Sequence, residues 1–141
     1  MKRRSFIKGT AIVTTASAIV TSPVPEGFSR SKSDHANNPG TIIHSVYFWL
    51  KKGLSSSEEK EFLNFFQALK NIPVTKKLTF GKPAPTTTRS VTDNTFDYNL
   101  IITFENLEDI NVYETHPDHL AAAQKYSKFW ERVQVRDTII T

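Results

Sequence analysis

A histidine pair around a proline forms the densest group of side chains that can transfer protons. His116 and His119 flank two residues, one of them a proline, and Tyr113 precedes the pair. A further histidine, His44, lies in the most apolar strand-like stretch. Imidazole is the side chain best suited to proton transfer near neutral pH, and a phenol can serve as its partner. The sequence therefore predicts a small acid–base site.

Each histidine also has a purely structural interpretation. His119 is a candidate base that faces Tyr113, or a core histidine bonded to a backbone carbonyl or to that phenol. His116 precedes a proline at a helix start, where its side chain could cap the following turn. His44 could line a cavity or bond across to a helix. The residue types alone leave both roles open at each position.

A metal site is a third interpretation of the same histidines. His116 and His119 share one helix face, and His44 could supply a third nitrogen, as in catalytic zinc sites. Pro117 disturbs that geometry, and no carboxylate is clearly placed to support the ligands. The chain has no cysteine and no glycine-rich phosphate loop. We therefore predict no metal ion and no cofactor.

Hydrophobic patterns predict the elements that must position these residues. A capping box at Ser55–Glu58 starts a helix that ends before Pro73. The predicted order is strand 42–50, helix 55–71, strand 74–81, a loop at 83–95, strand 96–105, a helix from about 106 that restarts at Pro117 and reaches 130, and strand 133–140. This β-α-β-β-α-β order is typical of an α+β, ferredoxin-like subunit with helices on one face of an antiparallel sheet.

The apolar residues of these elements predict a core rich in aromatic rings. The first helix carries Phe62, Phe65 and Phe66 at helical spacing. The two pieces of the second helix carry an apolar series formed by Leu107, Ile110, Tyr113, Leu120, Ala123 and Trp130. A pocket within such a core would favour an apolar or aromatic ligand.

The first predicted strand, 42–50, is apolar on both faces. Tyr47 and Trp49 lie on the face opposite to His44, and Ile101 adds to that second face. A strand with one face in water would alternate apolar and polar residues more cleanly. Because two helical segments cover only one face of the sheet, we predict that a second copy covers the other. The product is a homodimer in the form of a dimeric α/β barrel.

The N-terminal residues have the pattern of an export signal. Residues 1–18 contain the pair Arg3-Arg4, a weakly apolar run and the small residues Ala16-Ser17-Ala18. That run is too short and too polar to span a bilayer stably. Residues 19–40 are predicted to be a disordered linker and residues 41–141 one domain. We therefore predict export to the periplasm by the twin-arginine pathway, with no membrane contact after signal removal.

Removing the predicted signal changes the charge of the chain. The full chain has 18 Lys and Arg against 14 Asp and Glu, a net charge of +4. Four of the basic residues and no acidic residue lie within 1–18, which leaves 14 of each and no net charge. A neutral domain gives no support for binding nucleic acid or an anionic membrane surface. The predicted partners are a second copy and a small molecule.

Three segments together resemble the stress-responsive A/B barrel (Dabb) family. They are His44-x-Val46-x-Phe48, Phe96-Asp97-Tyr98 and Tyr113-x-x-His116-Pro117-x-His119, of which the last is the most specific. The resemblance covers residues 41–140 and implies a ferredoxin-like subunit and a barrel-forming homodimer. The segment 113–131 is also similar to plant polyketide cyclases, in which a histidine and a tyrosine act as acid and base in an aldol cyclisation.

The resemblance to these cyclases implies roles for individual residues. His119 would be the general base and Tyr113 its partner. The ligand pocket would be lined by His44, Val46, Phe48, Phe62, Phe66, His116 and Trp130. Phe66 stands where such a cyclase is expected to have a tyrosine, so one hydroxyl is missing. Ala121 and Ala123 stand where glycines are expected, which would shrink the pocket.

These features predict an exported homodimer that binds a small apolar or aromatic molecule and acts on it by His/Tyr acid–base chemistry of the cyclase or lyase type. The alternative is a non-catalytic structural or stress-protective module, in which self-association is the function and the histidines only pack. An open cavity between helices and sheet favours the first hypothesis. A gap filled by side chains favours the second.

Overall fold

Four strands and two helical regions follow the predicted order. The computed structural model describes residues 38–141, so the predicted signal, 1–18, and most of the predicted linker, 19–40, lie outside the described residues. The elements are β1 (Ile42–Leu50), α1 (Ser56–Lys70), β2 (Lys77–Gly81), β3 (Tyr98–Phe104), α2 (Leu107–Thr115), α3 (Pro117–Tyr126), a 3-10 turn (Ser127–Phe129) and β4 (Trp130–Ile139).

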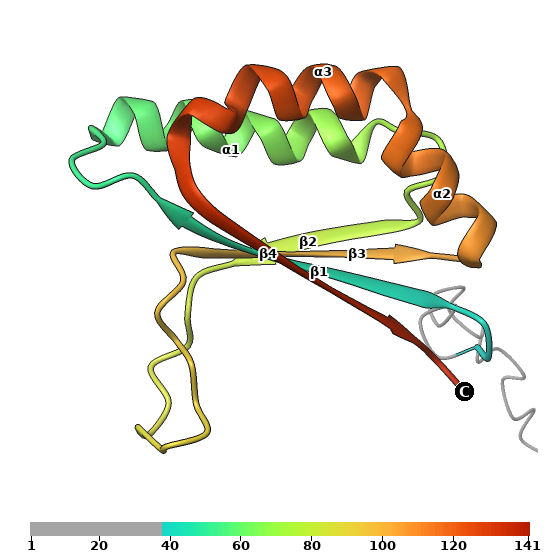
Figure 1. The fold of residues 1–141 in the computed structure, drawn as a ribbon, viewed down its shortest axis with the longest axis horizontal. Coiled ribbons are helices and arrows are strands. Elements are labelled where there is room, and N and C mark those ends of the chain that lie inside the picture. Colours follow the sequence, from blue (N-terminus) through green and yellow to red (C-terminus); the bar gives the residue numbers. More distant parts are fainter. Residues whose placement is uncertain (1–37) are drawn as a thin grey trace, which may run out of the picture. The chain divides into compact units, whose positions relative to one another are not determined.

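The strands form one antiparallel sheet in the order β2-β3-β1-β4. All three helices lie on the same side of this sheet, and the loop between β2 and β3 extends from its other side (Figure 1). This is the ferredoxin-like α+β arrangement, and the predicted fold class is confirmed. In residues 38–141, no helix is both long and apolar enough to cross a bilayer.

The first helix forms where the capping box was predicted. The Ser55 side chain accepts a hydrogen bond from the Glu58 N–H, and the Glu58 carboxylate accepts one from the Ser55 N–H. The helix ends at Asn71, before Pro73. Its inward face buries a run of apolar side chains, Phe62, Phe65, Phe66 and Leu69. This face anchors the helix layer to β1 and β3.

The second helical region breaks at His116, as predicted from Pro117. The Asn106 side chain caps the start of α2 by accepting a hydrogen bond from the Asp109 N–H. His116 is extended and serves both as the last cap of α2 and the first cap of α3. Proline fits the first turn of a helix because its missing N–H would have no partner there. The break brings the end of α2 and the start of α3 side by side.

Several predicted boundaries and faces are wrong in detail. The extended residue at the α2–α3 break resets the helical phase, so Leu120 on α3 is 55% exposed. Leu107, the first residue of α2, is 62% exposed. On α3, Ala122 and Tyr126 are buried instead. β4 begins at Trp130 rather than at 133, because that residue pairs with β1 across a bulge.

Other boundary differences are at β2, at β3, which spans Tyr98–Phe104 rather than 96–105, and at the start of the domain. β2 begins at Lys77 rather than at 74, after a turn closed by a Thr75–Ile72 backbone hydrogen bond. Residues 38–40, predicted to belong to the linker, form a turn whose Gly40 N–H donates to the carbonyl of Ile140.

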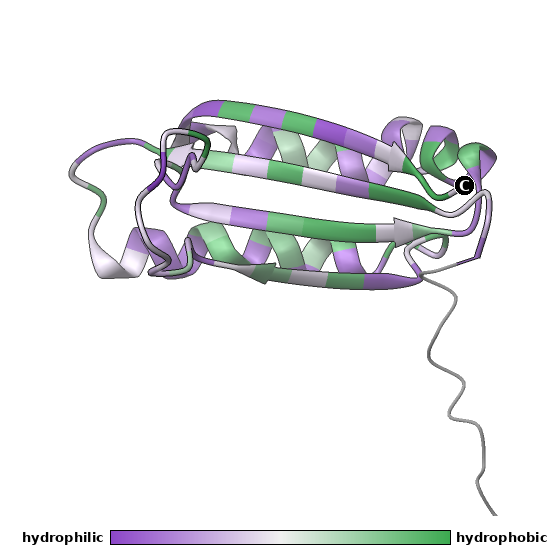
Figure 2. Cartoon of the chain, turned by 90° about the horizontal axis from the view of Figure 1, so that it is seen from below, coloured by the Kyte–Doolittle hydropathy of each residue, from purple (hydrophilic) through white to green (hydrophobic). Residues whose placement is uncertain are grey.

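The two faces of the sheet differ in what covers them. The helix side of β1 and β3 is buried, with Phe48, Leu100 and Phe104 at 2% exposure or less. The other side mixes hydrophobic and hydrophilic residues and has no helix over it (Figure 2). Guanidinium groups of β4 stack there on the predicted aromatic residues of β1, Arg132 on Trp49 at 4.0 Å and Arg136 on Tyr47 at 5.7 Å.

Candidate active site

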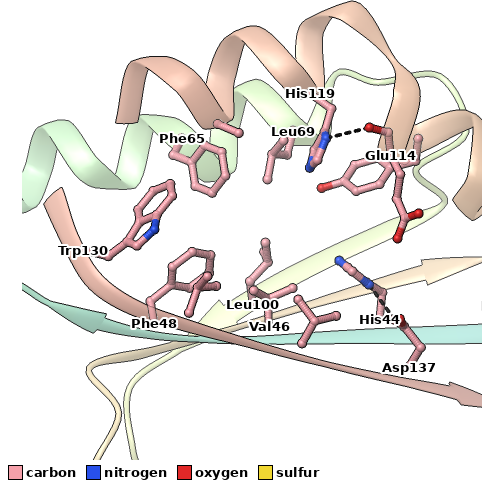
Figure 3. A pocket seen from close by; sticks show the side chains of 14 residues that line it. His44, Val46, Phe48, Phe65, Leu69, Leu100, Glu114, His119, Trp130 and Asp137 are labelled. Carbon is pink, nitrogen blue, oxygen red and sulfur yellow. Dashed lines mark hydrogen bonds and ion pairs between the residues drawn. The ribbon is translucent and has the colours of Figure 1, made fainter. Parts of the chain in front are cut away.

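A cavity of about 530 Å³ lies between the sheet and the helices. Its 14 lining residues separate into two ends (Figure 3). The apolar part is formed by Val46, Phe48, Phe65, Leu69, Leu100, Ala123, Trp130, Val133 and Val135. The polar end is formed by His44, Tyr113, Glu114, His119 and Asp137. A hollow of this size suits a small amphiphilic molecule.

His119 lies on the first turns of α3, and its ring points into the cavity (Figure 3). Its Nδ1 lies 3.2 Å from the backbone carbonyl oxygen of Glu114. Because a carbonyl only accepts hydrogen bonds, Nδ1 carries the proton in the neutral ring and Nε2 keeps a free lone pair. Burial lowers the pKa of His119, although its hydrogen bond to Glu114 acts in the opposite direction. A neutral imidazole with a free nitrogen is the form that a general base requires.

Tyr113 lies on α2 directly beside this imidazole. The two ring centroids are 4.5 Å apart, and the tyrosine is 1% exposed. Burial raises the pKa of the Tyr113 phenol far above its usual range, so the hydroxyl stays protonated. Among residues 38–141, no side chain or backbone group forms a hydrogen bond with that hydroxyl. The phenol is thus a donor without a protein acceptor in the described domain.

His44 and Asp137 form a pair on the sheet below. They occupy directly opposite positions of β1 and β4, which brings the side chains on one face of two strands into contact. The Asp137 carboxylate accepts a hydrogen bond from Nδ1 of His44 at 2.6 Å. His44 is 6% exposed, and its second ring nitrogen points away from Asp137 into the cavity (Figure 3). The carboxylate fixes the orientation of this second imidazole.

Glu114 contributes to the polar end twice. Its backbone carbonyl holds His119, while its carboxylate extends toward the space between His119 and His44 (Figure 3). This carboxylate has no hydrogen-bond or ion-pair partner in the described domain. The side chain lies one residue after Tyr113 at the end of α2 and is exposed.

Sequence reasoning missed both carboxylates, although one left a signal. Asp137 is the polar interruption in the alternating series Val133, Val135, Ile139, and the antiparallel register places it opposite His44. The polar member of an apolar strand face is a natural partner for a buried histidine. Glu114 gave no such signal, because a glutamate near a helix end is usually a solvated surface residue.

Six of the predicted site residues line the cavity, and three do not. Those that line it are His44, Val46, Phe48, Tyr113, His119 and Trp130. Phe62 and Phe66 are 0% exposed and lie in the closed core behind the cavity wall, where surrounding rings cover them. His116 is also outside, because its Nδ1 accepts a hydrogen bond from the Asp118 N–H and caps α3. Of the two alanines that stand where glycines were expected, Ala123 lines this cavity and Ala121 lines a different surface hollow.

A second hollow of about 570 Å³ lies at the other end of β1. Its lining contains lysines and carboxylates but no histidine. Two of these groups already satisfy each other, since Lys82 donates to Glu59 at 2.8 Å. In the described part of the chain, no three His, Asp or Glu side chains come close enough together to hold a metal ion. The histidine-lined cavity is therefore the stronger candidate for chemistry.

Comparison with known sequences relates the chain to one family and to one characterised protein. The sequence profile described as the stress responsive A/B barrel domain matches residues 42–140. Olivetolic acid cyclase from Cannabis sativa is 27% identical over 97 residues, an alignment that covers 68% of this chain and 93% of that protein.

Solved structures with the same fold extend the comparison. A dimeric, ferredoxin-like protein of unknown function from Bacteroides fragilis is 27% identical, with 71% of this chain and 96% of that one covered and a TM-score of 0.55. A hydroxynitrile lyase from Passiflora edulis has a TM-score of 0.63 at 22% identity, over 74% and 96% of the two chains, and shows the fold alone. The chain belongs to the stress-responsive A/B barrel domain family.

Proposed function

We propose that this domain binds a small apolar or aromatic molecule in the cavity and acts on it by acid–base chemistry. His119 is the base, and Tyr113 is the hydrogen-bond donor. One observation carries the proposal: the His119 ring is anchored through Nδ1 on a backbone carbonyl and lies 4.5 Å, centroid to centroid, from the Tyr113 ring. This arrangement leaves an accepting nitrogen and a donating hydroxyl beside the same hollow.

The two groups suit a proton transfer next to a carbonyl. Nε2 of His119 takes a proton from the carbon beside a substrate carbonyl, and the electron pair moves onto the carbonyl oxygen. The Tyr113 hydroxyl stabilises that developing enolate by donating a hydrogen bond. The enolate carbon can then form a bond to a second carbonyl carbon of the same molecule, whose oxygen takes up the proton. That sequence is an aldol cyclisation, and the 27% identity to a protein named as a cyclase supports it.

We further propose that the protein is exported by the twin-arginine route to the periplasm and works as a homodimer. The export proposal rests on the motif in residues 1–18. The dimer proposal rests on the helix-free face of the sheet, with Ile101 37% exposed, and on a 27% identical relative described as dimeric. Most soluble homo-oligomers are twofold dimers, which favours this assembly.

The test measures proton abstraction directly. Benzylacetone, a neutral aromatic ketone, is incubated with the protein in heavy water, and deuterium uptake beside the carbonyl is followed by proton NMR. We expect exchange above the buffer rate, lowered about 100-fold or more in His119→Gln and strongly in Tyr113→Phe. His116→Asn is the matched control, because asparagine preserves the helix cap outside the cavity.

Two outcomes would contradict the acid–base role. Exchange at the buffer rate, with the ketone bound, would leave a binding protein without this chemistry. Exchange that is unchanged in His119→Gln would assign the base elsewhere. Thermal unfolding of each variant is measured alongside, so that a loss of exchange rate caused by unfolding can be recognised.

A further inference from the structure

We propose that the molecule bound in this cavity carries a protonated amino group at its polar end, so that the ligand is a small amphiphilic amine. The inference rests on the proposed function, since it assumes that the cavity binds a ligand, and it names the chemical class of that ligand. The assignment comes from the charges and the unpartnered polar atoms of the lining.

The lining carries two carboxylates and neither lysine nor arginine. Glu114 and Asp137 are among the 14 lining residues, and none of the 14 is lysine or arginine. The end of α2 and the start of α3 both lie at this place, and their partial charges are of opposite sign, so the two carboxylates decide the charge of this end. An anionic ligand would meet repulsion from these groups, whereas a cationic one would be attracted.

The two carboxylates are not equivalent. Asp137 already accepts a hydrogen bond from the buried His44 at 2.6 Å. The Glu114 carboxylate has no partner in the described domain, although it lies at the end of α2, where a negative charge is unfavourable for the helix. It is directed toward the space between His44 and His119 (Figure 3). Glu114 is therefore the group that would hold an ammonium ion.

Two polar atoms of buried residues point independently to a ligand at this end. The Tyr113 hydroxyl and the second ring nitrogen of His44 belong to residues that are 1% and 6% exposed. Neither atom has a hydrogen-bond partner in residues 38–141, and both residues line the cavity. Both atoms face the cavity with a hydrogen-bonding position open, so they can bind the polar head of a ligand.

The opposite end accepts the rest of the molecule. Phe48, Phe65 and Trp130 form an aromatic wall there, with ring centroids 5.3 Å apart for Trp130 against each of the phenylalanines. An aromatic ring or a short alkyl chain fits this wall, with the ammonium group directed toward Glu114. Such a ligand matches the cavity in both polarity and charge.

The experiment compares three probes that differ in one group. Phenylbutylamine, phenylbutanol and phenylbutyric acid share a ring and a chain but carry positive, zero and negative charge at neutral pH. Calorimetric titration should show the amine binding about tenfold more tightly than the acid, with the alcohol between them. Glu114→Gln should remove the preference, and Glu114→Lys should reverse it. Glu108→Gln, a carboxylate on the same helix outside the cavity lining, should keep it.

The outcomes separate this inference from the proposed function. Binding of the alcohol with equal affinity for amine and acid would overturn the amine assignment and leave the cavity as a binding site. A preference that survives in Glu114→Gln would also overturn it. Binding of none of the three probes would overturn the proposed binding function, and the assignment with it.

Discussion

The space between the helices and the sheet is filled at one end and hollow at the other. Around Phe62, which is 0% exposed, the rings of Phe48 and Phe66 lie at centroid distances of 5.5 and 5.0 Å. Around Tyr113, the rings of His44 and His119 lie at similar distances, 5.9 and 4.5 Å. The spacing of the rings is alike, but Phe62 and Phe66 are closed off from the cavity, whereas the second group lines it and leaves polar atoms without partners.

The difference distinguishes residues that stabilise the fold by packing from residues that the fold positions for binding or chemistry. Close-packed phenylalanine rings contribute burial and van der Waals contact, with no polar group to satisfy. Imidazole and phenol groups whose open hydrogen-bonding positions face a cavity add little to packing but are available to a ligand. Proteins tolerate such groups mainly at functional sites.

The hollow end lies under the break between α2 and α3. Tyr113 and Glu114 end the first of these helices, and His119 lies just inside the second. The break frees the Glu114 carbonyl from the helical hydrogen-bond ladder, and His119 uses it. A continuous helix would engage that carbonyl internally. The filled end has no such break, because α1 runs unbroken across it.

The largest expected effect is at the filled end. Phe62→Ala should lower the free energy of unfolding by about 3 to 5 kcal/mol, since it removes a fully buried ring and leaves a cavity. Urea denaturation measures this value. Leu120→Ala, at a 55% exposed position, should change it by less than about 0.5 kcal/mol. A loss below about 1 kcal/mol in Phe62→Ala would mean that the filled end does not hold the fold together.

An intermediate effect is expected at the sheet side of the hollow end. Asp137→Ala leaves the Nδ1–H of buried His44 without its acceptor, and we expect a loss of about 1 to 2 kcal/mol. Asp118→Ala is the matched control, because that carboxylate is 74% exposed and lies 3.8 Å from its histidine. Equal losses in the two variants would show that the His44–Asp137 pair is no more than a surface contact.

The residues of the filled end could be predicted from the sequence, and so could some residues of the hollow end. Periodicity alone placed Phe62 and Phe66 on the buried face of a helix, because hydrophobic spacing reports burial. It could not tell a closed core from a cavity wall, which depends on distances between elements. The same limit explains why both were expected in the pocket.

Residues of the hollow end differed in how readily they could be predicted from the sequence. His119 and Tyr113 stood out, because histidine and tyrosine are rare and their spacing in this motif is specific. Asp137 required the register between β1 and β4, which decides what lies opposite His44. Glu114 required the direction of one side chain at a helix end, and no pattern in a single sequence encodes it.

The smallest expected effect concerns the protonation of His119. Burial lowers its pKa below the ordinary value of 6.5, so in the window between these two values the unfolded chain binds the proton more readily than the folded one. Acidification through this window therefore favours unfolding, and the stabilising contribution is fully present only above the ordinary value. His119→Gln removes the titrating group and should lose less stability as the pH falls.

The informative quantity is the difference in unfolding free energy between the two proteins, because they share every titratable group except His119. Urea denaturation from about pH 8 to about pH 5 should give a difference in unfolding free energy that is constant at high pH and moves in favour of the variant as the pH falls below the ordinary value. The exchange rate of the wild type should fall over the same window, because protonated His119 cannot accept a proton. Parallel stability profiles would indicate that the imidazole is as well hydrated in the fold as in the unfolded chain. The hollow end would then be open to water, and a dry acid–base site would lose its physical basis.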